Sequence, residues 1–164
     1  MKTFLLHIII AFVAAYQFFL HLQVLPYNAT TASGVFFTVF FLLWPTSLLY
    51  HPSYFRKLPK AINLFFFFVK EVLLANLKIA YDIITPNYIM RPAFLALPLT
   101  LKDDVGITLL ACMISLTPGS LSVDLREDKG VLYVHTLYVK NNELEQMKKF
   151  IKHGFERRII ELIT

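Results

Sequence analysis

The first third of the chain is almost free of charge. No Asp, Glu, Lys or Arg occurs among the 53 residues from Thr3 to Phe55. A helix that spans a bilayer needs about 20 apolar residues, because each residue adds about 1.5 Å along the helix axis. Turn-forming residues at 26–34 divide this stretch. We therefore expect two transmembrane helices, at about 4–25 and 35–50.

The start of the chain also resembles a signal peptide. Ala11, Ala14 and Ala15 are candidate residues for its cleavage site. The apolar stretch is longer than the roughly 7–15 residues of a signal-peptide core. That length favours a helix that stays in the membrane.

The predicted spans contain few groups that could carry an ion. Cation and proton pathways through lipid are usually marked by carboxylates or lysines, and both spans lack them. His7 and His21 lie 14 residues apart and could share a helix face. They fit either a proton relay that faces a partner or two residues near opposite membrane surfaces. The second interpretation is favoured because imidazole near the headgroups costs little.

The distribution of basic residues predicts the orientation. The loop at 26–34 has no Lys or Arg, whereas Arg56, Lys57 and Lys60 follow the second predicted span. Basic residues in short loops stay in the cytoplasm. We therefore expect both ends of the chain to be cytoplasmic.

A third hydrophobic stretch, Ile62 to Ile84, carries its charge on one side. The polar stripe that it would form on a helix contains Asn63, Lys70, Glu71, Lys78 and Asp82. This pattern favours a helix in the plane of the membrane or packed on a partner, with the stripe as a docking surface. A third span within a helix bundle is the alternative, although a charge that faces lipid at mid-bilayer costs about 2.5–3.5 kcal/mol.

The last part of the chain predicts a small α+β domain. Phe94 to Leu101 is typical of an extended segment, and Pro98 places it at a sheet edge or a bulge. Asp103 and Asp104 provide the amino-terminal cap of a helix at about 104–115. Pro118 and Gly119 then fit the two central positions of a type II turn.

A β-hairpin and a helix complete the predicted domain. The hairpin turns at Glu127–Gly130, and a turn centred on Asp128 and Lys129 fixes its register. The expected neighbours are Leu125 with Leu132, Val123 with Val134, Asp124 with Tyr133, and Ser122 with His135. An amphipathic helix follows from Glu143 to Leu162.

The predicted fold class is thus a membrane protein with an α+β domain. Two transmembrane helices occupy residues 1–52, and a basic linker with an amphipathic interfacial helix, or a third span, occupies residues 53–86. A cytoplasmic α+β domain with a β-hairpin occupies residues 87–164. Of the net charge of +5, residues 1–86 carry +4. This excess indicates contact with anionic lipid, since no basic stripe interleaved with aromatic residues points to nucleic acid.

No motif predicts catalysis, a cofactor or a metal site. The chain has no phosphate-binding loop, dinucleotide fingerprint or paired-cysteine motif, and its one cysteine is Cys112. Ser122, Asp124 and His135 are of the residue types of a hydrolase triad, but they lie on a regular hairpin without a nucleophile elbow. We expect the chain not to be an enzyme.

Residues 107–125, followed by Leu132-Tyr133-Val134-His135, closely resemble the MrpE/MnhE family, the E-type subunits of the multisubunit Mrp-type (Mnh-type) Na+/H+ antiporters. Further matches are Lys70-Glu71, Asn76, Pro86, Arg91-Pro92, Leu97-Pro98-Leu99 and Phe155-Glu156-Arg157. The resemblance covers nearly the whole chain. Two positions depart from the family pattern, because Cys112 stands where Asn is usual and Ser120 where Thr is usual.

The resemblance implies an accessory subunit of a cation/proton antiporter in a bacterial or archaeal cell membrane. Its partners would be the other antiporter subunits and membrane lipid, with ion translocation left to the large subunits. Candidate structural or assembly residues are Lys70, Glu71, Asn76, Asp82, Pro92, Pro118, Gly119, Asp124 and His135. The alternative is a free-standing membrane-anchored binding or assembly protein that recruits a cytoplasmic partner through its α+β domain.

Overall fold

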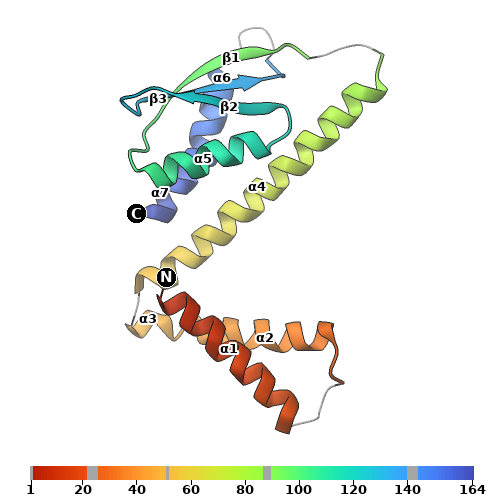
Figure 1. Ribbon diagram of the computed structural model, residues 1–164, viewed down its shortest axis with the longest axis vertical. Coiled ribbons are helices and arrows are strands. Elements are labelled where there is room, and N and C mark those ends of the chain that lie inside the picture. Colours follow the sequence, from red (N-terminus) through yellow and green to blue (C-terminus); the bar gives the residue numbers. More distant parts are fainter. Residues whose placement is uncertain (1, 22–25, 51, 87–89, 140–143) are drawn as a thin grey trace. The chain divides into compact units, whose positions relative to one another are not determined.

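The computed structural model describes residues 2–21, 26–50, 52–86, 90–139 and 144–164 (Figure 1). The chain divides into two compact units, Met1–Pro59 and Lys60–Thr164, and each is described by itself. The first unit is helical where it is described, and the second combines helices with a three-stranded sheet.

Two apolar helices make up most of the first unit. α1 spans Lys2–His21, α2 spans Ala29–Leu43, and the short α3 spans Ser47–Tyr50. α1 and α2 pack against each other. Apolar side chains buried in this unit are Ala11, Ala15 and Phe40. Most other apolar side chains on the two helices remain exposed or half-buried.

The segments Phe4–His21 and Ala29–Leu49 are long and apolar enough to cross a membrane. Only 17% and 11% of their residues are buried, whereas the core helix of a soluble protein would be mostly covered. They are the two such segments in the described part of the chain. The prediction of two apolar amino-terminal helices is confirmed.

The second helix begins at Ala29, earlier than the predicted start at residue 35. Asn28 caps it, because its side-chain Oδ1 accepts a hydrogen bond from the Thr31 backbone N–H at 2.9 Å. In return, the Asn28 backbone N–H donates to the Thr31 hydroxyl at 3.2 Å. This capping box satisfies groups that a helix start otherwise leaves unpaired. The polar residues that were interpreted as a loop are therefore mostly helical.

α4 spans Pro52–Ile84 and is 33 residues long. Helix was predicted only from Ile62, and the basic segment expected to be a linker is helical as well. Pro52 occupies the first helical position, where its missing N–H costs nothing. From Lys60 onward, α4 belongs to the second unit.

The sheet of the second unit is antiparallel, in the order β1-β3-β2. Its strands are β1 Ala93–Pro98, β2 Ser120–Leu125 and β3 Val131–Thr136. β1 lies at an edge, one of the two positions expected from Pro98, but it ends at Pro98 and is shorter than the predicted extended segment to Leu101. Before β2, α5 spans Asp104–Leu116, and the Asp103 side chain caps it by accepting from the Gly106 N–H at 2.7 Å. The predicted cap and helix are confirmed.

The hairpin register agrees with the prediction near the turn and departs from it farther away. Leu125 pairs with Leu132 and Asp124 with Tyr133, as expected. A β-bulge between Ser122 and Asp124 then shifts the register, so that Ser122 pairs with Val134 and Leu121 with His135. The predicted pairs of Val123 with Val134 and of Ser122 with His135 are therefore wrong, because a bulge adds one unpaired residue to a strand.

The bulge turns Ser122 toward α5. Its hydroxyl donates to the Ala111 carbonyl at 3.1 Å, and its backbone N–H donates to the Ser115 hydroxyl at 3.1 Å. These two bonds tie β2 to the helix that precedes it. A period-two pattern alone does not reveal such a local exchange of partners.

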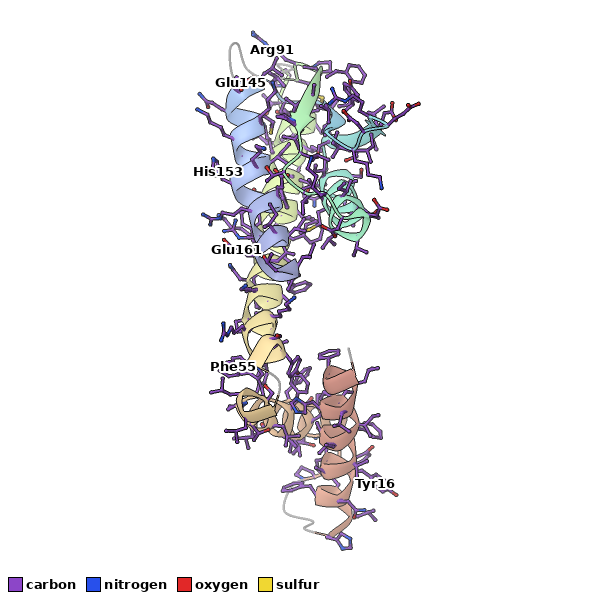
Figure 2. The ribbon with its side chains drawn as sticks, turned by 90° about the vertical axis from the view of Figure 1, so that its left-hand side faces the viewer. Tyr16, Phe55, Arg91, Glu145, His153 and Glu161 are labelled. Carbon is purple, nitrogen blue, oxygen red and sulfur yellow. The ribbon has the colours of Figure 1, made fainter. Side chains whose placement is uncertain are left out.

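The carboxyl-terminal helical segment is divided by one wider turn. α6 spans Leu144–Ile151, a π-helical turn spans Lys152–Glu156, and α7 spans Arg157–Ile163. The predicted first residue, Glu143, lies outside the described residues. This segment and α5 lie on the same side of the sheet (Figure 1). In Figure 2, the labelled Glu145, His153 and Glu161 mark the outer side of the segment.

The core of the second unit lies between the sheet, α5 and the carboxyl-terminal segment. Its most buried apolar side chains include Leu95, Leu97, Leu110, Ile114, Val134, Phe155 and Ile159. Leu64 of α4 joins this cluster, and Phe67 and Phe68 pack against it. α4 is therefore a structural part of the domain.

Candidate functional site on the charged side of α4

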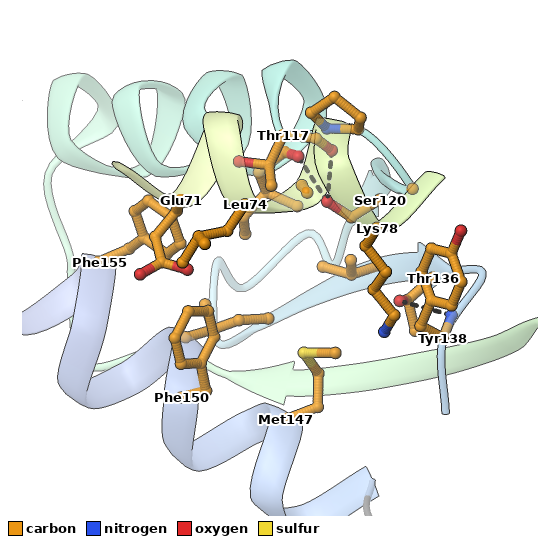
Figure 3. A pocket seen from close by; sticks show the side chains of 16 residues that line it. Glu71, Leu74, Lys78, Thr117, Ser120, Thr136, Tyr138, Met147, Phe150 and Phe155 are labelled. Carbon is orange, nitrogen blue, oxygen red and sulfur yellow. Dashed lines mark hydrogen bonds between the residues drawn. The ribbon is translucent and has the colours of Figure 1, made fainter. Parts of the chain in front are cut away.

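The polar stripe of α4 faces the chain's own α+β domain. Glu71, Lys78 and Asp82 are spaced by seven and four residues, which places them on one helix face with the buried Leu64. Glu71 and Lys78 line a cavity of about 240 Å³ (Figure 3). Of these three side chains Asp82 is buried, Glu71 is half-buried and Lys78 stays exposed, so the domain covers the stripe only in part, and its role as a docking surface stays a prediction.

Several elements of the second unit line the cavity. The turn after α5 contributes Thr117, Pro118, Gly119 and Ser120, and β3 contributes Val134 and Thr136. Met147, Phe150 and Phe155 line it from the carboxyl-terminal helical segment. Most of the lining side chains are apolar, and a few are polar.

The turn after α5 has the predicted type II geometry. Gly119 has a φ of +88°, and the Ser120 N–H donates to the Thr117 carbonyl at 3.2 Å. The Ser120 hydroxyl donates to the carbonyls of Thr117 at 2.9 Å and Ile114 at 2.7 Å. The Ser120 side chain therefore holds the end of α5 at the point where the chain continues into β2 (Figure 3).

Tyr138 connects the turn with α4. The Lys78 ammonium lies 3.8 Å from the centre of the Tyr138 ring, within the range of a cation–π interaction. A Cβ atom built on Gly119 would lie 3.0 Å from the same ring, so glycine allows the ring to pack on the turn. Burial, with the neighbouring carboxylate of Asp82, raises the pKa of Tyr138 to about 12. Asp82 itself is buried.

Four predicted residues are thus brought together: Glu71, Asp82, Pro118 and Gly119. Sequence reasoning missed Tyr138, since nothing in its local pattern distinguishes it from the other tyrosines. It placed Lys78 in the stripe without assigning it to a site. The cluster depends on a contact between α4 and Tyr138, which follows the end of β3, and local sequence does not encode this contact.

The other predicted residues lie elsewhere. Lys70 is exposed with its ammonium 3.8 Å from the Glu71 carboxylate, and the Asn76 amide donates to the Val72 carbonyl at 2.8 Å. Pro92 is exposed just before β1. These three side chains do not line the cavity.

Asp124 and His135 belong to the outer face of the sheet. Asp124 accepts a hydrogen bond from the Leu125 N–H at 2.8 Å, and the His135 ring lies 5.0 Å from the Phe94 ring. Because the bulge turns Ser122 toward α5, its hydroxyl lies on the other face from His135. Across the described part of the chain, no group of three or more His, Cys, Asp or Glu side chains could hold a metal ion.

Glu156 is a buried acidic residue. The sequence analysis named it only within the Phe155-Glu156-Arg157 match to the family. Its carboxylate accepts hydrogen bonds from the backbone N–H groups of Thr100 and Leu101, the second at 3.0 Å. The Lys152 ammonium lies 3.7 Å from its other oxygen. A carboxylate is stable in the core when such donors replace its water. The side chain therefore holds the carboxyl-terminal segment to the chain that follows β1.

Comparison with known proteins decides the family. The model of the Na+/H+ ion antiporter subunit family matches residues 2–162. The chain belongs to the Na+/H+ ion antiporter subunit family. The resemblance drawn from the residues is confirmed, and the chain is a membrane protein from a family of transporter components.

Two relatives of this antiporter subunit illustrate the extent of the similarity. The E-type subunit of the Na+/H+ antiporter of Alkalihalophilus pseudofirmus is 38% identical over 109 residues, which cover 66% of this chain and 68% of that protein. The E-type subunit of the Na+/H+ antiporter of Bacillus subtilis is 32% identical over 141 residues, which cover 82% of this chain and 87% of that protein. Both matches agree with the family assignment.

A solved structure shares the fold of this antiporter subunit. A chain of the membrane-bound sulfane sulfur reductase, an archaeal respiratory membrane complex, aligns with a TM-score of 0.55 at 21% identity. The alignment covers 97% of this chain and 98% of that chain. At this identity the likeness concerns the fold.

Proposed function

We propose that this chain is an accessory subunit of a multisubunit Na+/H+ antiporter, supporting assembly or coupling without carrying ions itself. The observation that carries the proposal is where the charged side chains of this chain lie. The two candidate spans have no Asp, Glu, Lys or Arg. Glu71, Lys78 and Asp82 of α4 are directed to the chain's own domain.

His7 is the one buried ionisable side chain of α1 among the described residues, and it lies among aromatic rings. Its ring centre is 6.5 Å from that of Phe40 and 5.3 Å from that of Tyr54. His21 is exposed at the end of α1. A proton relay needs a succession of ionisable groups at hydrogen-bond distance, and packing between rings favours a structural role for His7.

Partners of this subunit would be the other antiporter subunits and membrane lipid. Large apolar side chains are exposed along both candidate spans, for example Phe12, Phe37 and Leu42. Exposed apolar surface of this extent is typical of contact with lipid or with a partner. The basic residues Arg56, Lys57 and Lys60 favour a cytoplasmic position for the α+β domain.

The second candidate function is a free-standing membrane-anchored binding protein. The outer face of the sheet favours it, because Phe94, Leu121 and Tyr133 are exposed there beside His135. An antiporter component that docks on its partners would use the same surface. Purification in mild detergent separates the two functions, since the first requires the large antiporter subunits to copurify.

The test of the accessory role is antiport in vesicles that contain equal amounts of assembled complex. The full chain alone should give no Na+-dependent proton flux. His7→Gln and His21→Gln together should leave the rate and its pH profile unchanged, because Gln keeps polarity but does not titrate between pH 5 and 8. Loss of exchange at equal complex content would contradict the proposal. Asp82→Asn should reduce activity only in proportion to the amount of assembled complex.

A further inference from the structure

The side of α4 opposite its charged stripe is an exposed apolar row. Phe66, Leu73, Leu77 and Ile84 are spaced by seven, four and seven residues, so they follow one face of the helix. Phe66 is 66% exposed, Leu77 is 68% exposed and Ile84 is 80% exposed. Between Phe66 and Ile84 the row is about 27 Å long at 1.5 Å per residue. Contiguous apolar surface of this length marks a contact that the isolated chain leaves unmade.

The polar groups beside this row are basic or neutral. Lys70 lies next to it with its side chain 68% exposed, and Asn76 is exposed on the same side. The two acidic residues of α4, Glu71 and Asp82, are on the opposite face with the domain. The outward surface of α4 is therefore apolar, with Lys70 as the cation beside it. The Lys70 ammonium lies 3.8 Å from the Glu71 carboxylate, but its side chain is 68% exposed and can also reach an anionic lipid headgroup.

A spanning arrangement does not suit this helix. α4 is not among the segments that are long and apolar enough to cross a membrane in the described part of the chain. Its inner face is attached to a domain with exposed ion pairs such as Arg126 with Asp128, at 2.7 Å. Carrying those charges into hydrocarbon would be strongly unfavourable. The apolar row on the outer side of α4 carries no charge, so it can enter the membrane without this penalty.

The sequence leads α4 directly from the membrane. The second candidate span ends at Leu49, and α4 begins at Pro52. Arg56 and Lys57 follow within the first two turns. A helix that starts at the membrane surface and has an apolar and basic outer side can remain in that surface.

We propose that α4 lies in the plane of the membrane, with Phe66, Leu73, Leu77 and Ile84 inserted at the headgroup level of an anionic leaflet. The α+β domain occupies the other side of the helix and uses the charged stripe. This arrangement does not depend on the antiporter function, because it follows from the distribution of apolar and charged groups on one helix.

Spin labels on the full chain would test the proposal. The single native cysteine is removed by Cys112→Ala, and Phe66→Cys, Leu73→Cys, Leu77→Cys and Ile84→Cys are labelled one at a time. The protein is reconstituted in phosphatidylcholine vesicles with and without phosphatidylglycerol. Collision rates with oxygen and with a water-soluble nickel complex then report the depth of each label.

The expected result is one similar, shallow depth at all four positions when phosphatidylglycerol is present. Val13→Cys, in the middle of α1, should be deep, and Thr108→Cys, exposed on α5, should collide freely with nickel. Omitting phosphatidylglycerol or adding Lys70→Gln should shift the four labels toward water. Unchanged thermal unfolding would show that each labelled variant keeps its fold.

Three patterns of depth would overturn the proposal. If the labels in the middle of the row were much deeper than those at its ends, α4 would be a third span. Free access of nickel to all four labels would show a surface open to water. Shielding from both reagents, in vesicles or in the assembled complex, would show that a protein covers the row. In addition, if the depths were the same with and without phosphatidylglycerol and in the Lys70→Gln variant, that result would exclude the anionic surface as the partner.

Discussion

Gly119 is the residue at which a backbone requirement and a packing requirement coincide. Its φ of +88° lies in the left-handed region, where a side chain is strained. Its missing side chain also leaves room for Tyr138. Tyr138 in turn contacts Lys78 and lies beside Asp82. Gly119 therefore leaves room for the Tyr138 ring to pack between the turn and α4.

Gly119→Ala should lower the free energy of unfolding by about 1–3 kcal/mol, because strained backbone costs this much. The new Cβ would also lie 3.0 Å from the Tyr138 ring. The measurement is denaturant unfolding of the full chain in detergent. Gly34→Ala is the matched control, since its Cβ would meet no atom within 4 Å. Equal effects of the two substitutions would contradict the assigned role of the turn.

Tyr138 should titrate at higher pH than an ordinary tyrosine. Burial, with the carboxylate of Asp82, raises the pKa of Tyr138 to about 12, from a usual value of 10.0. The folded state thus holds this proton more tightly than the unfolded state. The resulting stability is complete below about pH 10 and is lost as the pH rises toward 12.

Tyrosinate absorbance of the wild type minus that of Tyr138→Phe would measure this titration. The difference should show one tyrosine with a pKa near 12. Adding Asp82→Asn should lower that pKa and leave it above the usual value, because burial is the larger cause. A difference curve centred at the usual value would show that the hydroxyl is solvated.

At the level of elements, the second unit depends on how α4 and the carboxyl-terminal segment join the sheet. Phe67 of α4 packs 5.1 Å from the Phe155 ring, and the Arg158 guanidinium lies 4.0 Å over the Phe67 ring. Gly154, in the π-helical turn, allows this approach, because a Cβ there would lie 2.9 Å from Phe67. The wider turn therefore occurs where α4 and the core meet the segment.

Glu156→Ala should destabilise this junction. It would leave the backbone N–H groups of Thr100 and Leu101 without their acceptor, and an unsatisfied buried donor costs about 1–3 kcal/mol. Denaturant unfolding would measure the loss. Glu161→Ala is the control, because that exposed carboxylate pairs with Arg157 at 3.4 Å and such pairs contribute at most about 1 kcal/mol. A loss no larger than that of Glu161→Ala would show that water replaces the acceptor.

For the whole molecule, the main feature is how much apolar surface stays exposed. Large apolar side chains are exposed on α1 and α2, on the outer row of α4 and on the outer face of the sheet. A soluble monomer rarely leaves several such surfaces uncovered. The chain is therefore suited to lipid on some surfaces and to partner subunits on others, as expected of a small member of a membrane complex.

The orientation can be tested with single cysteines in a Cys112→Ser background. Tyr27→Cys lies just before α2, at a residue that is 80% exposed, and should react with an impermeant reagent in intact cells. Thr108→Cys, exposed on α5, should react only after lysis. This follows from the basic residues after the second span. Reaction of Thr108→Cys without lysis would place the domain outside and contradict the proposed orientation.

Sequence by itself determined the elements that depend on local composition. A run of 53 uncharged residues predicts two apolar helices because their length is set by the bilayer. Asp103 predicts the start of α5, and Pro118-Gly119 predicts its end, because caps and turns are made by neighbouring residues. The family was also recognised from local runs of residues.

Only the tertiary structure decided which surfaces these elements cover. The stripe of α4 was identified from its period, but its direction depends on Leu64 and Phe67 packing into a distant core. The bulge at Ser122 depends on hydrogen bonds to α5, and the site at Tyr138 on the meeting of α4 with the end of β3. Periodicity fixes which residues share a face, whereas the partner of that face is chosen by long-range packing.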